Sequence, residues 1–321
     1  MKLKYKYVIG CLVQWYEIEL VEEYLQSVRQ ALKYVDNSEN VIVDIKFTTN
    51  QQLERIDKTQ IDMSTIEKKF LSMVEDGWNV EMTDELITIA DYRRWFNDFY
   101  CETADVLMWG ETDSLIPRQT FKILDDLHDS SINNGTYKYL AFFGGCKMWD
   151  KSWEPIEHND FTDKPFIDGD TENWWSLRYN MTISEMNDIN DKVDDLDVRV
   201  VNPYKFNGCG LVISSDVIRS GVNIPKSVFF VHEDTAFMHS LIQNFQGKIP
   251  QFIIKNILLV HNRKHPQKRN YVLGEKDIDK RDTGALRKAH DWYEKANKMS
   301  EYNAYNLFNQ SKTYKWGDVF K

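Results

Sequence analysis

Residues 7–13 read YVIGCLV, residues 18–32 read IELVEEYLQSVRQAL, and residues 41–48 read VIVDIKFT. The first and third stretches are short apolar runs rich in β-branched residues, which is typical of buried strands. In the second stretch the apolar residues recur at helical spacing. Strand, helix and strand in this order form a βαβ unit, which normally builds a parallel sheet.

The same alternation continues along the chain. We expect strands over residues 104–109, 137–143, 206–215 and 251–260, and helices over 91–100, 118–128 and 235–244. Residues 51–90 are polar and mostly helical in pattern. The sequence therefore predicts an α/β fold with a Rossmann-like, mostly parallel central sheet flanked by helices, and a helical C-terminal extension.

Three segments describe the expected organisation. Residues 1–270 form the catalytic domain, and residues 271–321 form the helical extension. Within the domain, residues 150–200 are acidic and rich in Asn and Trp, with weak periodicity. We interpret them as a long excursion over a cleft, on the side of the acceptor.

Composition places the chain among globular proteins. Hydrophobic residues make up 42% and charged residues 28% of the 321, which excludes wholesale disorder and fibrous repeats. The four cysteines are scattered, with no CxxC pair, which suggests a reducing compartment. No signal peptide and no membrane-spanning run is recognised, so we expect a cytoplasmic protein. The oligomeric state stays open.

Charge is distributed unevenly along the chain. The formal net charge is −10, with −18 over residues 1–245 and +8 over residues 246–321. The basic part is either a solvated tail or a positive surface that holds phosphates.

The first cluster with chemical potential is Glu111-Thr112-Asp113, directly after a predicted strand. In a turn, two carboxylates at this spacing can both reach the carboxyl edge of the sheet, where open α/β folds bind ligands. Such oxygens suit Mg²⁺ or Mn²⁺ bridging to substrate phosphates. The alternative is a solvated turn in which Asp113 or Ser114 caps the next helix.

A second cluster is His232-Glu233-Asp234, at the start of a predicted helix. One interpretation is a general base at a cleft, and the other is simple capping of the helix. In the preceding segment FNGCGLVISS, Gly208 and Gly210 would let a ligand approach the backbone.

The third cluster, HNRKHPQKR, spans residues 261–269. His261 could complete a metal shell, while Lys264, Lys268 and Arg269 could offset the charge of a departing pyrophosphate. The alternative is an exposed basic turn. In the excursion, Trp174 and Trp175 could stack on a sugar ring or a nucleobase, or could anchor the loop to the core.

Taken in order, these motifs resemble the GT-A nucleotide-sugar glycosyltransferases, closest to the family 2 type. MWGETDSLIP aligns with that family's DxD motif, the acid after it and its LLP-like run, with Glu111, Asp113 and Ser114 at the three acidic positions. The family's ED pair falls on Glu233-Asp234 and its metal-binding His on His261. The resemblance covers residues 7–269.

The resemblance implies an inverting transfer from a nucleotide diphosphate sugar, with a uridine-linked donor as the first choice. Asp234 is then the base and Glu233 an acceptor or orienting contact, while Mn²⁺ or Mg²⁺ is held by Asp113, Glu111 and His261. The donor is expected to contact Gln14, Tyr16, Glu17, Arg94, Thr112, Lys264, Lys268 and Arg269. The acceptor side is expected to include Trp174, Trp175, Gly208 and Gly210.

The chain also departs from the family, because IKFTTNQQ replaces the usual Asp-Asp-Gly-Ser after the second strand. Asp44 or Asn50 would then have to contact the nucleobase. The acceptor is a glycan or, given the Lys/Asn/Tyr-rich composition, a hydroxymethylated base in phage DNA. Two alternatives are a non-catalytic nucleotide-sugar or carbohydrate-binding protein and a nucleotidyltransferase, although residues 13–17 are not a glycine-rich phosphate loop.

Overall fold

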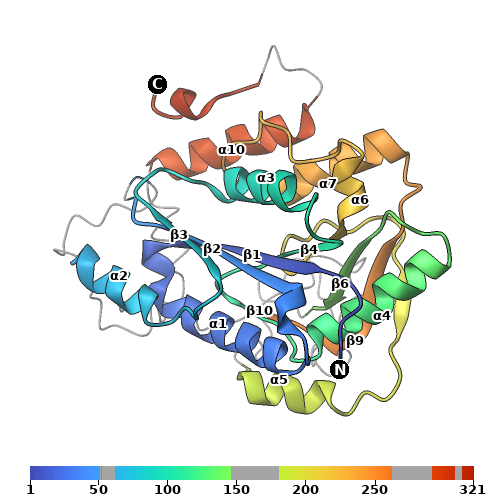
Figure 1. Ribbon diagram of the computed structural model, residues 1–321. Helices are drawn as coiled ribbons and strands as arrows, with labels where there is room; N and C mark the ends of the chain where they lie inside the picture. Colours follow the sequence, from blue (N-terminus) through green and yellow to red (C-terminus); the bar gives the residue numbers. More distant parts are fainter. Residues whose placement is uncertain (51, 53–61, 146–180, 262–290, 308–312) are drawn as a thin grey trace, which may run out of the picture.

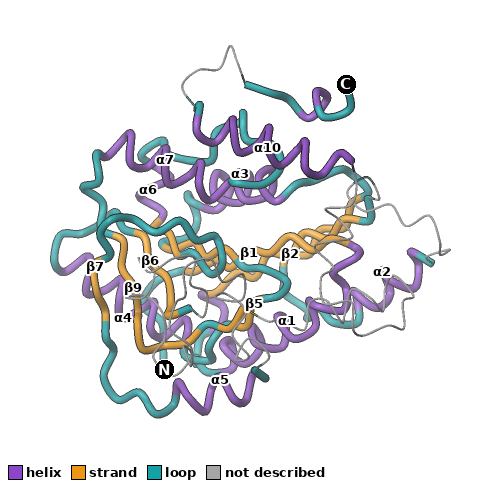
Figure 2. Tube along the Cα trace, turned by 180° about the vertical axis from the view of Figure 1, so that it is seen from behind, coloured by secondary structure: helices purple, strands orange, loops and turns teal. Residues whose placement is uncertain are grey.

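The structure is a computed structural model that describes residues 1–50, 52, 62–145, 181–261, 291–307 and 313–321. A central sheet lies between two layers of helices (Figure 1). The helices α3, α6, α7 and α10 cover one face, and α1, α2, α4 and α5 cover the other, as Figure 2 shows from behind.

The central sheet has eight strands in the order β3-β2-β1-β4-β8-β6-β9-β7. Their bounds are β1 Tyr7–Gln14, β2 Val41–Thr48, β3 Asn79–Thr83, β4 Val106–Trp109, β6 Leu140–Gly144, β7 Val198–Val200, β8 Val212–Ser214 and β9 Gln251–Leu258. A separate antiparallel pair consists of β5 (Ser114–Leu115) and β10 (Val260–His261).

Most neighbours in the sheet are parallel. Strand β1 pairs in parallel with β2 along its whole length, from Tyr7 opposite Val41 to Gln14 opposite Thr48, and also with β4. Strands β2–β3 and β6–β9 are parallel as well, whereas β8 and β7 run antiparallel to their neighbours. This confirms the predicted mostly parallel α/β sheet.

Helices α1, α3, α4 and α7 lie close to predicted positions and α10 falls in the predicted helical extension, whereas α5 and α6 were not predicted. The helices are α1 Ile18–Lys33, α2 Met63–Leu71, α3 Ile89–Tyr100, α4 Thr120–Asn133, α5 Ile183–Asn190, α6 Ser215–Arg219, α7 Glu233–Phe245 and α10 Asp291–Tyr305. Helix α1 packs Val21, Tyr24, Leu25 and Val28 into the core against β1, since all four are buried. On the other face, Tyr92 and Phe96 of α3 pack in a second cluster with Val8 and Leu107.

Two predicted segments are corrected. Residues 51–90 are not mostly helical where they are described, because β3 adds a parallel edge strand after the single helix α2. The predicted strand over 206–215 shortens to β8, because the chain turns at Gly210, whose φ is +67°. Glycine adopts this left-handed conformation without steric cost.

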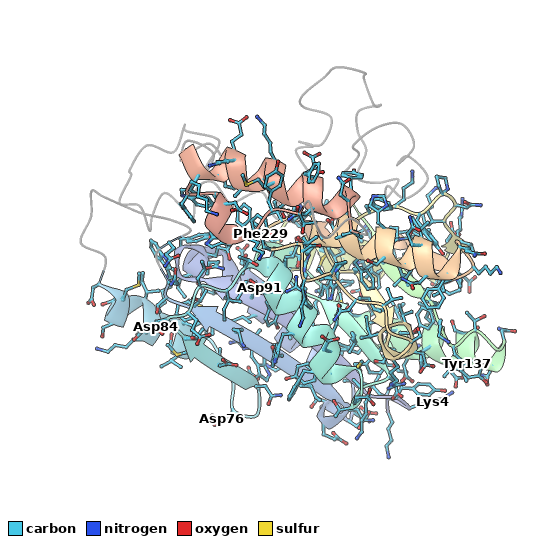
Figure 3. All side chains as sticks on the ribbon, turned by 90° about the horizontal axis from the view of Figure 1, so that it is seen from above. Lys4, Asp76, Asp84, Asp91, Tyr137 and Phe229 are labelled. Atoms are coloured by element: carbon cyan, nitrogen blue, oxygen red, sulfur yellow. The ribbon has the colours of Figure 1, made fainter. Side chains whose placement is uncertain are left out.

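The C-terminal segment contains helix, as predicted, and packs on the cleft side of the domain. Phe230 has its ring 5.7 Å from that of Trp292 in α10 and 5.6 Å from that of Trp316 near the end of the chain. The neighbouring Phe229, labelled in Figure 3, has its ring 5.7 Å from that of Trp316. The predicted boundary at residue 270 and residues 150–180 of the excursion lie outside the described residues. The described part of the predicted excursion is corrected: residues 181–200 are not a loop over the cleft but supply helix α5 and strand β7, which pairs with β9 at the edge of the central sheet.

Among the described residues, no helix is both long enough and apolar enough to cross a bilayer.

Candidate active site

The topology brings several chain segments to one edge of the sheet. Strands β1 and β4 are parallel neighbours, so Gln14–Glu17 and Gly110–Asp113 leave the sheet at the same edge. Strand β8 runs antiparallel to β4, with Val212 opposite Met108, so the residues before β8 lie where β4 ends. This is the carboxyl edge of the parallel strands, where open α/β sheets bind ligands.

A cleft of about 260 Å³ opens at this edge. Of the predicted donor contacts, Gln14, Tyr16, Glu17 and Thr112 line it together with Glu111 and Asp113. The remaining lining residues are Leu12, Thr88, Ile89, Gly110, Phe230 and Val231. The predicted turn after β1 and the predicted acidic turn after β4 therefore face one cavity.

Arg93 of α3 is the central cation of the site. Its side chain is 2% exposed, and its guanidinium donates to Glu233 Oε1 at 2.5 Å and to Glu111 Oε1 at 2.7 Å. The guanidinium also donates to the Gly208 carbonyl and lies over the Trp109 ring, 4.6 Å from its centroid. One planar cation therefore ties α3 to the ends of β4 and α7, because its fork of donors reaches two carboxylates at once.

Glu233 is buried in the first turn of α7. Removal from water raises the pKa of its carboxyl to about 7, against the pull of Arg93, and the nearby Asp234 adds to the rise. Arg93 does not offset the rise in the Glu233 pKa fully, because the effect of burial is larger than that of Arg93 and the charges of Asp234 and Glu111 oppose it.

Asp234, the predicted base, follows Glu233 and is partly exposed. Its Oδ1 accepts from the Thr235 amide at 2.7 Å. A Cβ built on Gly208 would lie 3.4 Å from the Asp234 Cβ, so the two residues adjoin. The helix starts abruptly here, because His232 adopts a left-handed φ of 66°. Its ring Nε2 lies 3.1 Å from Asn297 Oδ1 of α10, which accepts the hydrogen bond.

His261 reaches the acidic turn through the short β5–β10 pair, in which it lies opposite Ser114. Its Nε2 is 3.2 Å from Asp113 Oδ2 and 3.6 Å from Glu111 Oε2. The Ser114 hydroxyl donates to the Glu111 carbonyl at 2.9 Å and thereby closes the turn rather than capping a helix.

These donors fit a divalent cation. Two ligands about 2.1 Å from one ion, at a right angle, lie about 3 Å apart, close to the separation of Asp113 Oδ2 and His261 Nε2. Glu111 keeps Oε2 available, since Arg93 contacts Oε1. A carboxylate and imidazole set of this kind suits Mn²⁺ or Mg²⁺. His261 therefore lies close to both predicted carboxylates. Asp113 is not a member of the described group whose ligand atoms all lie within 4.8 Å of one another, which includes Glu111 and His261.

The structure gives packing roles to the two glycines predicted on the acceptor side, and their acceptor role stays a prediction. A Cβ on Gly208 would lie 2.5 Å from Arg93 Nη1, so this glycine makes room for the buried cation. A Cβ on Gly210 would lie 2.5 Å from the Leu259 side chain, at a backbone φ of +67°. Close packing against Arg93 and Leu259 is therefore enough to explain why these two positions are glycine.

Arg94 was the predicted donor contact on α3, but the structure places Arg93 in the site instead. Arg94 points to the loop before α7, where it donates to the carbonyls of Ile224, Pro225 and Val228. Helical spacing could have distinguished the two, because Arg93 shares a face with the buried Ala90, Phe96 and Asn97.

The suggested nucleobase contacts after β2 also differ. Asp44 is buried and accepts from the hydroxyls of Tyr92 and Tyr100 at 2.7 and 2.6 Å, so it belongs to the interface of the sheet with α3. Burial raises the pKa of its carboxyl. Asn50 is bound to its neighbours, with its carbonyl accepting from Trp15 Nε1 at 3.0 Å.

Five predicted site residues lie outside the described residues: Trp174, Trp175, Lys264, Lys268 and Arg269. Their roles stay predictions.

No protein-family model matches the chain, and no curated protein matches its sequence. Among solved structures, S. aureus TarS 1-349 is similar over 98% of this chain and 76% of its own, with 10% identity and a TM-score of 0.43. A 4-diphosphocytidyl-2C-methyl-D-erythritol synthase from Anaerococcus prevotii DSM 20548 is similar over 84% and 97%, with 10% identity and a TM-score of 0.35. A putative nucleotide-diphospho-sugar transferase from Desulfovibrio desulfuricans G20 is similar over 45% of this chain and 59% of its own, with 10% identity and a TM-score of 0.27. The function proposed below rests on the contacts of the site.

Proposed function

We propose that this chain is a GT-A-like glycosyltransferase that moves a sugar from a nucleotide diphosphate sugar, with UDP as the preferred nucleotide, to an acceptor hydroxyl. The observation that carries the proposal is the Arg93 bridge. Its contacts at 2.7 and 2.5 Å join Glu111 of the acidic turn to Glu233 beside Asp234. The bridge holds Glu111 and Glu233, with its neighbour Asp234, at one edge of the sheet, and this supports donor binding and proton abstraction at one place.

The charge of the cleft supports a divalent cation. The residues that line it within the described part of the chain include Glu17, Glu111 and Asp113 but no Lys, Arg or His. A diphosphate would be repelled by these carboxylates unless a cation lay between them. Asp113, Glu111 and His261 would hold Mn²⁺ or Mg²⁺, which would supply the positive charge that offsets a diphosphate.

Asp234 acts as the general base in the proposed reaction. Its carboxylate takes the proton of the acceptor hydroxyl while the hydroxyl oxygen bonds to the anomeric carbon. The bond from that carbon to the diphosphate oxygen breaks, and its electron pair leaves with the nucleoside diphosphate. A single displacement of this kind inverts the anomeric configuration. Glu233 and Arg93 orient this end of α7.

Substitution of Asp234 tests the base. Asp234→Asn keeps the size of the side chain and its acceptor oxygen toward the Thr235 amide. We expect transfer to fall by at least about 100-fold, as is usual when a general base is lost, while donor affinity stays within about twofold. Product formation from radiolabelled donor and calorimetric titration of UDP measure the two effects. Transfer at the wild-type rate would remove the base assignment.

The donor can be found by a thermal-shift screen of nucleotide sugars with and without Mn²⁺. A ligand that binds only the folded state raises the melting temperature. We expect a uridine-linked sugar to stabilise the protein in the presence of Mn²⁺ and to lose most of this effect in EDTA. Equal shifts with and without the ion would contradict a metal-held diphosphate.

The acceptor is proposed to be a glycan, with a hydroxymethylated base in DNA as the second choice. The net +8 of residues 246–321 favours contact with a nucleic acid backbone, whereas the net −18 of residues 1–245 opposes it. Steep salt dependence of binding to duplex DNA would favour the DNA acceptor, and no binding at low salt would exclude it.

One observation favours a second candidate, a nucleotide-sugar-binding protein without turnover. Arg93 already neutralises one oxygen of Glu111, at the position of the family's first Asp, and this reduces the charge available to a cation. Slow hydrolysis of the bound donor in the presence of Mn²⁺ would exclude this candidate.

A further inference from the structure

Cys209 lies in the candidate metal site, although nothing in its sequence context indicates it. The Sγ atom of Cys209, a carboxylate oxygen of Glu111 and a ring nitrogen of His261 all lie within 4.8 Å of one another. The three residues come from the loop before β8, the turn after β4 and strand β10. Asp113 adjoins this set through its 3.2 Å contact with His261.

The backbone fixes Cys209 in this place. On its C-terminal side, the Gly210 amide donates to the Trp109 carbonyl at 3.1 Å, and the Trp109 amide donates to the Leu211 carbonyl at 2.9 Å. On its N-terminal side, the Cys209 amide donates to Asn207 Oδ1 at 3.1 Å. The thiol is therefore held beside the end of β4 by main-chain bonds.

A buried hydroxyl beneath the same turn also points to a missing ligand. Tyr24 is wholly buried, and its Oη has no hydrogen-bond partner among the described residues. A Cβ built on Gly110 would overlap this hydroxyl, so the hydroxyl lies directly under the residue that precedes Glu111. A buried hydroxyl without a partner is costly. A water or a thiolate on a bound cation would give it an acceptor.

We propose that Cys209, Glu111 and His261 form a site for a thiophilic divalent cation such as Zn²⁺, with the Cys209 thiolate as a ligand. The thiol releases its proton to solvent when it binds the ion. Three protein ligands of this kind leave a fourth position open, as in zinc sites that also bind a substrate or water. The inference rests on the proposed cation site, and it adds that the site selects soft ions over Mg²⁺.

Cobalt provides a direct test, because a thiolate bound to Co²⁺ gives a charge-transfer absorption band in the near ultraviolet. We expect the Co²⁺-loaded protein to show this band, Cys209→Ser to lose it, and Cys101→Ser to keep it. Cys101 is a matched control because it directly follows α3, and its Sγ contacts the carbonyl of Asp98 within that helix. A band that survives in Cys209→Ser, or Co²⁺ binding without any band, would overturn the proposal.

Selectivity separates the thiolate from general damage to the site. In Cys209→Ser we expect the affinity for Zn²⁺ to fall by at least about tenfold, because the ion loses a thiolate ligand. The affinity for Mn²⁺ should fall by less than about threefold, because Mn²⁺ prefers oxygen ligands. Equal losses for the two ions would contradict a thiolate ligand. Competition with a chromophoric chelator measures both affinities.

A second measurement uses the unaltered protein, so that a variant that fails to fold cannot obscure the result. We expect Zn²⁺ to slow the alkylation of Cys209 by iodoacetamide at least about tenfold, and Mg²⁺ to leave its rate unchanged. An unchanged rate with Zn²⁺ would overturn the proposal. All three experiments omit donor and acceptor. If the protein does not transfer sugar, the three metal-binding results still stand. If it transfers sugar but shows no thiolate band, only the thiolate ligand is rejected and the proposed function stands.

Discussion

Among single residues, Arg93 contributes most to the electrostatics of the site. A buried guanidinium needs acceptors for its donors, and here two carboxylates and the Gly208 carbonyl accept from its terminal nitrogens, while its Nε has no partner among the described residues. Three acids, Glu111, Glu233 and Asp234, act on one cation. The site therefore holds more negative than positive charge among its described side chains, which favours both a proton on Glu233 and a cation beside Asp113.

The raised pKa of Glu233 predicts a stability change with pH. The folded-state value of about 7 exceeds the ordinary 4.5, so between these values the folded protein binds more protons than the unfolded chain. The stabilising effect of this excess is present below pH 4.5 and is lost as the pH rises to 7. Relative to Glu233→Gln, the wild-type free energy of unfolding should fall by about 3 kcal/mol over this window.

Urea denaturation at a series of pH values measures this difference. Glu294→Gln is the control, because Glu294 is exposed in α10, where it pairs with Lys298. The control should show no such change between pH 4.5 and 7. A difference between wild type and Glu233→Gln that does not vary with pH would contradict the burial of an uncompensated carboxyl.

Among the elements, the loop before β8 positions the Arg93 guanidinium. Its Gly208 has no side chain, and the space is filled by the Arg93 guanidinium. The small β5–β10 pair has a comparable role for His261, which it places opposite Ser114. The loop before β8 and the β5–β10 pair therefore set the positions of the site residues, and the long parallel strands provide the sheet edge beside which these short elements lie.

Gly208→Ala tests the role of this loop. The added Cβ would press on Arg93 Nη1, and overpacking of this kind typically costs about 1–3 kcal/mol of unfolding free energy. We also expect weaker UDP binding in the presence of Mn²⁺, because Arg93 would shift from Glu111. Gly145→Ala is the matched control, since a Cβ there meets no atom of the described residues within 4 Å. Equal stability and affinity in both variants would contradict a steric role for Gly208.

The long elements could be predicted from the sequence because they carry their own periodic pattern. Strand β2 coincides with the predicted Val41–Thr48, and α1 differs from its prediction by a single residue. Strands β3 and β7 could not be predicted, since they are short edge strands with few buried side chains, and their pairing depends on distant partners. For the same reason the metal-site prediction omitted Cys209, which meets Glu111 and His261 only through the tertiary fold.

At the scale of the whole molecule, the C-terminal segment supports the cleft. Phe230 lines the cavity and is also packed against Trp292, Tyr293 and Trp316. Asn297 of α10 contacts His232, the residue before the acidic pair of α7. The stability of the site therefore depends on elements that follow the central sheet in sequence.

Phe230→Ala tests this coupling. The side chain is 3% exposed, and removal of a buried phenyl ring typically costs about 3–5 kcal/mol of unfolding free energy. We expect a loss of this size together with weaker UDP binding, because the cleft loses part of its wall. Tyr137→Ala is the control, since Tyr137 is 53% exposed at the opposite end of the molecule (Figure 3). A loss no larger than that of the control would contradict the packing of α10 against the cleft.

The central claim is that the cleft between the ends of β1 and β4 binds a nucleotide diphosphate. Determination of a crystal structure of the protein with UDP and Mn²⁺ tests it most directly. We expect the uridine to lie beside Gln14 and Tyr16, and the ion to contact Asp113 and His261. A diphosphate bound elsewhere on the protein, or no binding at millimolar UDP, would contradict it.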